Sequence, residues 1–149
     1  MSATLFDTNI WLAAVFTSHP FHSIAALALQ QATALEPAVF CRATEQSFLR
    51  LASTPITLKT YGAEGFTNRD ALAALRALQA LPQVTVQSEP LGTVNLWHSF
   101  AGLSSASPKV WMDAYLAAFA KSGNLRMVTL DRDFNNFVPQ GLDLRLLGA

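Results

Sequence analysis

Short apolar runs alternate with longer stretches in which apolar residues recur at helical spacing. The short runs have the length of strands and cover residues 4–6, 38–41, 84–86, 125–130 and 142–147. The stretches between them predict helices over residues 10–16, 21–34, 44–52, 70–81, 91–103 and 108–122. Strands joined through helices of about a dozen residues indicate right-handed crossovers. The pattern therefore predicts an α/β fold, with a parallel sheet covered by helices on both faces.

Polar and cyclic residues mark the ends of these predicted helices. Asn68 is predicted to be the N-cap of the helix over 70–81, and Pro108 to lie in the first turn of the last long helix. The residues that we expect on the buried face of that last helix are Met112, Tyr115, Leu116 and Phe119. The polar segment 57–67 follows Pro55 and is predicted to be a loop that could flank a binding groove.

Length and composition fit one domain over residues 1–149, and 51% of the residues are hydrophobic. The longest apolar runs, such as 114–120, are far shorter than the roughly 18 residues that cross a bilayer. Asp7 interrupts the first apolar run and no basic region precedes it, so we expect no secretory signal and a cytoplasmic location. The single Cys41 agrees with a reducing compartment and is expected to fill space in the core.

Asp7 comes directly after the first predicted strand. The last residue of such a strand lies at the rim of the sheet, where open α/β folds bind ligands. Asp7 could equally be the N-cap of the following helix, accepting hydrogen bonds from its free backbone N–H groups. This fragment alone leaves both interpretations open.

Three further acidic residues occupy comparable places in the pattern. Asp131 follows the fourth strand, while Glu45 and Asp113 lie in the opening turns of helices. In a parallel sheet these positions share one rim, so four carboxylates would converge. Such a cluster is unfavourable unless a cation lies within it. Oxygen ligands without His or Cys select Mg²⁺ or Mn²⁺, and either ion can activate water for attack on a phosphodiester.

The ten basic and ten acidic residues give no net charge, but their distribution is informative. If Asp7, Glu45, Asp113, Asp131 and Asp133 share one site, five of the ten acidic residues lie there. Ten basic residues then face only five acidic ones over the rest of the chain. A formally neutral protein of this kind could still attract a polyanion.

The chain resembles the PIN domain, specifically the VapC toxins of bacterial toxin-antitoxin pairs. The resemblance runs in order along the whole chain and rests on Glu45 and on residues 5–9, 11–13, 113–118 and 128–134. It implies a three-layer α/β/α fold around a five-stranded parallel sheet. It also implies endoribonuclease activity that depends on Mg²⁺ or Mn²⁺, a homodimer, and inhibition by a VapB-like antitoxin.

The same resemblance assigns roles to individual residues. It implies that the acidic residues of the site, which would be catalytic and would bind the metal, are Asp7, Glu45, Asp113 and Asp131. Asn9 and Thr129 match polar positions that support these ligands through hydrogen bonds. Asp133 either adds a ligand or caps the turn that follows it.

Other polar and aromatic residues are weaker candidates. Cations that could contact RNA phosphates are Arg132, Lys59, Arg69 and Lys109. Tryptophans that could stack on bases, but that more often fill a core or an interface, are Trp11, Trp97 and Trp111. We expect none of the three histidines to be catalytic, because His19, His22 and His98 lie away from the acidic motifs.

Two other functions compete with the nuclease hypothesis. A HAD-like phosphatase or phosphotransferase would use Asp7 as its nucleophile, but such enzymes usually carry a general acid two residues later, where this chain has Asn9. A non-catalytic PIN interaction module is the third hypothesis, and the presence of all four acidic residues argues against it.

Overall fold

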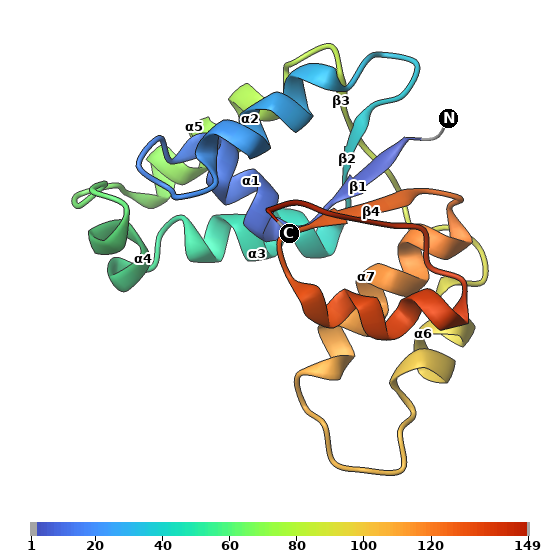
Figure 1. The fold of residues 1–149 in the computed structure, drawn as a ribbon. Helices are drawn as coiled ribbons and strands as arrows, with labels where there is room; N and C mark the ends of the chain where they lie inside the picture. The colour runs from blue at the N-terminus through green and yellow to red at the C-terminus, as the bar shows by residue number, and fades with distance from the viewer. Residues whose placement is uncertain (1–2, 149) are drawn as a thin grey trace.

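The computed structural model describes residues 3–148 and has a central sheet of five parallel strands in the order β3-β2-β1-β4-β5 (Figure 1). The strands are β1 (Thr4–Phe6), β2 (Ala38–Phe40), β3 (Val84–Val86), β4 (Arg126–Thr129) and β5 (Leu144–Leu146). The helices are α1 (Thr8–Val15), α2 (His22–Gln31), α3 (Arg42–Leu51), α4 (Pro55–Thr60), α5 (Asn68–Gln79), α6 (Thr93–Ala101), α7 (Val110–Ser122) and the 3₁₀ helix η1 (Arg132–Gln140). Each strand lies close to its predicted position.

The sheet separates two hydrophobic clusters. Successive residues of β1 point to opposite faces, so Phe6 packs with α1, α2, α3 and α5, while Leu5 packs with α6, α7 and η1. Figure 1 shows these helices in two layers on either side of the sheet. The three-layer α/β/α fold with five parallel strands is therefore confirmed.

Aromatic packing anchors α1 to the sheet. Trp11 has no exposed surface and stacks on Phe40 of β2, with ring centroids 3.8 Å apart and an interplanar angle of 7°. Trp11 is thus a core residue and cannot stack on a base. Cys41 is also fully buried, as expected.

The order of the strands places β1 next to β4 at the centre of the sheet. From β1 the chain moves outward through β2 to β3, and it then crosses back to β4 on the other side of β1. Such a reversal of strand order leaves a crevice at the carboxyl ends of the two central strands, where α/β proteins bind ligands. At this point the backbone N–H of Asp7 donates to the carbonyl of Val128 at 2.9 Å.

The predicted loop over 57–67 is partly wrong, because α4 occupies its first part. Pro55 lies at the first position of α4, where its missing N–H costs nothing. Leu58 is buried in the core and holds this short helix against the domain.

Two details of the predicted helices also differ. The N-cap of α5 is Thr67 and not Asn68, since Thr67 and Asp70 form a reciprocal capping box. Pro108 lies in a turn just before α7 rather than inside it.

The buried face of α7 is made mainly of alanines. Leu116 and Phe119 are buried as predicted, but Met112 is 51% exposed and Tyr115 is only partly buried. The alanines that replace them in the core are Ala114, Ala117, Ala118 and Ala120. Small side chains allow α7 to pack close to the sheet, which brings its first turn to the sheet rim. No helix within residues 3–148 is both long and apolar enough to cross a membrane.

Candidate active site

Asp7 both caps α1 and belongs to the polar crevice between β1 and β4. One carboxylate oxygen, Oδ1, accepts a hydrogen bond from the backbone N–H of Thr8 at 2.7 Å. The other, Oδ2, accepts one from the hydroxyl of Thr129 on β4 at 2.7 Å. Burial raises the pKa of Asp7, the bonds from Thr129 and Thr8 lower it, and the charge of Asp131 raises it again, with a net increase. The two interpretations of Asp7 left open by the sequence are therefore compatible.

Thr129 is the centre of a hydrogen-bond network. Its hydroxyl oxygen accepts from the backbone N–H of Asp131 at 3.0 Å and from the side-chain amide of Asn9 at 3.4 Å. The carbonyl oxygen of the same Asn9 amide accepts from the backbone N–H of Leu130 at 3.3 Å. These bonds tie the start of α1 to the end of β4 and fix the direction of the Asp7 carboxylate.

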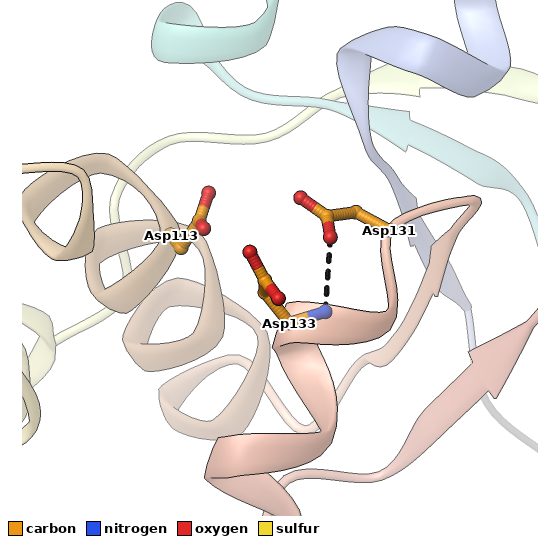
Figure 2. A group of neighbouring side chains, drawn as sticks. All are labelled: Asp113, Asp131 and Asp133. Atoms are coloured by element: carbon orange, nitrogen blue, oxygen red, sulfur yellow. Dashed lines mark hydrogen bonds between the residues drawn. The ribbon is translucent and has the colours of Figure 1, made fainter.

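Three aspartates from two segments gather beside this network. Figure 2 shows Asp113 on α7 facing Asp131 and Asp133, which follow β4. The three residues each offer an oxygen, and these oxygens all lie within 4.8 Å of one another. Asp131 also accepts from the backbone N–H of Asp133 at 2.9 Å and so caps η1. The capping role proposed for Asp133 thus belongs to Asp131, and the Asp133 carboxylate joins the cluster.

The charges of four acidic residues meet at Asp113. Its pKa is raised from 3.8 to about 6, first by burial and then by the charges of Asp131, Asp7 and Asp133. Thr129 bonds to both Asp7 and the backbone of Asp131, and Asp131 shares the cluster with Asp113. Asp7 and Asp113 therefore lie on the same side of the molecule, although 106 positions separate them in the sequence.

Glu45 lies in the first turn of α3 and is only 7% exposed. Gln79 of α5 donates to its Oε2 at 2.6 Å. The Oε1 atom lies 2.8 Å from the Arg42 guanidinium, but the geometry is not that of a hydrogen bond, so this buried oxygen retains an unused lone pair. Gln79 and Arg42 therefore fix the position of the Glu45 carboxyl group.

These residues fit a hard divalent cation. Carboxylates supply all the converging ligand atoms, which matches the oxygen preference of Mg²⁺ and Mn²⁺. The mutual repulsion that raises the pKa of Asp113 is the interaction that a cation would relieve. The residues that would hold the ion are Asp113, Asp131 and Asp133, and Asp7 lies close enough for its charge to act on Asp113. Glu45 is not among the residues whose oxygens converge in this cluster.

The predicted phosphate-binding cations are spread over the surface. Arg132 is exposed next to Asp131, and Lys109 is exposed one turn before Asp113. Arg69 is exposed near the start of α5. Lys59 lies on α4, which Figure 1 shows at the outer end of its layer, away from α7. Arg132 and Lys109 therefore flank the acidic cluster, whereas Lys59 does not.

The histidines have structural contacts. The ring of His19 stacks on Tyr61 at 4.7 Å, and a ring nitrogen of His22 lies 2.8 Å from the carbonyl oxygen of Ala13. His98 lies against Trp97, with ring centroids 4.9 Å apart.

The sequence prediction missed the residues that surround Glu45. Arg42 and Gln79 contact its carboxylate, and Arg50 lies two turns further along α3. The signal for the arginines was present, because Arg42, Gln46 and Arg50 recur at every fourth residue on the helix that carries Glu45. The signal for Gln79 was absent, since only the packing of α5 on α3 brings it to Glu45.

Comparison with known proteins agrees with this arrangement. A family model described as the PIN domain matches residues 4–138. The chain is 43% identical over 144 residues to Ribonuclease VapC41 of Mycobacterium tuberculosis, strain CDC 1551 / Oshkosh, and the match covers 96% of this chain and 97% of that protein. The match to Ribonuclease VapC41 of strain H37Rv has the same identity and coverage.

Two solved structures share the fold. VapBC2 from Rickettsia felis, bound to a DNA fragment from the promoter, gives a TM-score of 0.62 at 12% identity and covers 97% of this chain and 98% of that chain. VapC20 of Mycobacterium tuberculosis, a toxin that cleaves the sarcin-ricin loop, gives a TM-score of 0.62 at 16% identity, with 94% and 96% covered. At these identities the two structures support the fold alone.

Proposed function

This chain belongs to the PIN-domain family, and we propose on that premise that it is a metal-dependent endoribonuclease of the VapC type. Support comes from the ribonuclease that is 43% identical over almost the whole of both chains. The substrate is RNA, and the products are a 5′ phosphate and a 3′ hydroxyl. The cofactor is Mg²⁺ or Mn²⁺.

One observation carries this proposal: carboxylates from remote parts of the chain converge at the carboxyl ends of β1 and β4. The charges of Asp7, Asp131 and Asp133 all act on Asp113. Like charges held close together destabilise a fold, and such clusters are typical of functional sites. A cation site is the simplest function for such an arrangement.

We assign some residues of the site to cation binding and others to positioning the carboxylates. Asp113, Asp131 and Asp133 would hold the cation, while the hydrogen bond from Thr129 fixes the orientation of Asp7 beside them. Glu45, held by Gln79, lies in the first turn of α3, the helix that follows β2. When bound, the divalent ion offsets the charge of the phosphodiester and lowers the pKa of the attacking water.

The competing functions are less well supported. A nucleophilic Asp7 would need a general acid two residues later. Asn9 occupies the place of the general acid and is bonded to Thr129 and Leu130. A non-catalytic module would have no reason to keep four mutually repelling acidic residues.

The test is cleavage of RNA by the purified chain. Total RNA is incubated with Mg²⁺ or Mn²⁺, with EDTA as the blank, and new 5′ ends are mapped for the original chain and for Asp7→Asn and Asp113→Asn. We expect specific cuts that both substitutions and EDTA abolish. Glu64→Gln removes an exposed carboxylate elsewhere and should cut normally. Cuts that persist in Asp113→Asn, or none with either metal, would refute the proposal.

We further propose that the protein works in the cytoplasm as a homodimer neutralised by a VapB-like antitoxin. The relative from Rickettsia felis is a VapBC complex, which supports a partner of this kind. Light scattering during size-exclusion chromatography measures the dimer. Co-purification with the product of a neighbouring small reading frame, accompanied by loss of cleavage, tests the antitoxin.

A further inference from the structure

An open groove of about 580 Å³ runs between α3 and the first turns of α7. The residues that line it are Arg42, Ala43, Gln46, Ser47, Arg50, Met112 and Tyr115. The lining contains two arginines and no carboxylate, in contrast to the acidic cluster beside it. The groove is therefore a separate surface with the opposite charge.

The basic side of the groove is a stripe along α3. Arg42, Gln46 and Arg50 are exposed and lie four residues apart, so the stripe is about 12 Å long. Within residues 3–148, no carboxylate lies within ion-pairing distance of Arg50. An exposed guanidinium of this kind is free to bind a phosphate.

The groove begins where the acidic cluster ends. Arg42, at one end of the stripe, contacts Glu45 at 2.8 Å. On the opposite wall, Met112 directly precedes Asp113, which belongs to the acidic cluster. A polymer bound in the groove would thus continue into the site where its backbone is cleaved.

The wall formed by α7 offers an aromatic ring in a fixed position. The Tyr115 hydroxyl donates to Glu89 at 2.6 Å, and its ring meets that of Trp97 edge to face at 5.5 Å. Met112 lies beside it and is half exposed. A ring fixed by two contacts can stack on a base. The flexible thioether of Met112 can pack against the edge of that base.

We propose that this groove binds single-stranded RNA next to the cleaved bond. Arg50 and Arg42 contact successive phosphates, and a base packs on Tyr115 and Met112. The volume suits roughly one or two nucleotides and is too small for a duplex. The inference rests on the proposed function and adds to it the surface that holds the substrate. An acidic protein segment would compete for the same arginines but would have no use for the aromatic ring.

The test measures binding apart from cleavage. The Asp113→Asn protein, in Mg²⁺, is titrated into a fluorescein-labelled single-stranded RNA oligonucleotide, and anisotropy is followed at several salt concentrations. Adding Arg50→Gln should weaken affinity about fivefold and lower the slope of log K against log salt by about 0.7. Arg50→Lys should restore most of both. Arg145→Gln, which removes an exposed arginine bordering a different cavity, is the matched control and should change neither.

A second pair of variants tests the aromatic wall. Tyr115→Phe keeps the ring and its contact with Trp97 but loses the bond to Glu89, so it should retain most of the affinity. Tyr115→Leu should weaken affinity more, and neither variant should change the salt slope, because stacking releases no counterions. Affinity and slope that stay the same in Arg50→Gln, or change equally in Arg145→Gln, would overturn the inference. A failure of the proposed nuclease function would give a different result: the original chain would not cleave RNA.

Discussion

Replacing Asp113 by Asn should stabilise the metal-free protein while abolishing its activity. The repulsion of Asp131, Asp7 and Asp133, together with burial, raises the pKa of Asp113 to about 6. A neutral amide of the same shape removes that repulsion. The residue required for function is therefore expected to lower the stability of the fold in the absence of a cation.

The size of the effect follows from the pKa. A rise from 3.8 to about 6 would correspond to roughly 3 kcal/mol for a fully buried group. Asp113 is only partly buried, so solvent screening reduces the expected gain to about 1 kcal/mol. In a domain of 149 residues this raises Tm by about 3 °C.

The size of the stabilisation by Asp113→Asn depends on pH. A carboxyl group whose pKa is higher in the folded state disfavours folding once it ionises, so the penalty is complete above about pH 6. It declines as the pH falls from about 6 and disappears below 3.8, where the group is protonated in both states. The gain from Asp113→Asn should accordingly be full at pH 7 and much smaller at pH 4.5.

Thermal unfolding in EDTA measures this prediction, with Glu64→Gln as the control for removal of an exposed carboxylate. Adding Mg²⁺ or Mn²⁺ should raise Tm more for the original chain than for Asp113→Asn, because the cation binds the intact cluster more tightly. Our reasoning fails if Asp113→Asn has the same or a lower Tm than the original chain at pH 7, or if its advantage persists unchanged at pH 4.5.

Three further substitutions test other contacts. Thr129→Val leaves Oδ2 of Asp7 without its hydrogen-bond donor and should lower the unfolding free energy by about 1–3 kcal/mol in urea titration and suppress cleavage, whereas Thr129→Ser should retain the stability and the cleavage. Gln79→Leu removes the donor to Glu45 and should lower cleavage about tenfold with unchanged affinity for RNA; equal loss of both would contradict a positioning role. Thr67→Ala breaks the capping box of α5 and should cost about 1 kcal/mol without altering cleavage.

The hydrophobic pattern was sufficient to predict the layers of the fold. The alternation within β1 and the helical spacing in α5 and α7 depend on local backbone geometry. Local geometry fixes which face each residue occupies, so the pattern can be read from the sequence. The same locality allowed Asp7 and Asp131 to be placed after strands, and Glu45 and Asp113 in first turns. The errors in predicted helix boundaries occurred at residues that can either end one helix or begin the next, such as Pro55.

What the sequence determined by itself was the list of acidic residues and the class of fold that carries them. What only the tertiary structure decided was how they share the site: Asp131 takes the cap and leaves Asp133 free, while Gln79 and Arg42 reach Glu45. The groove between α3 and α7 likewise exists only once both helices are packed. Contacts between distant segments depend on the packing of whole layers, which no local pattern of residues encodes.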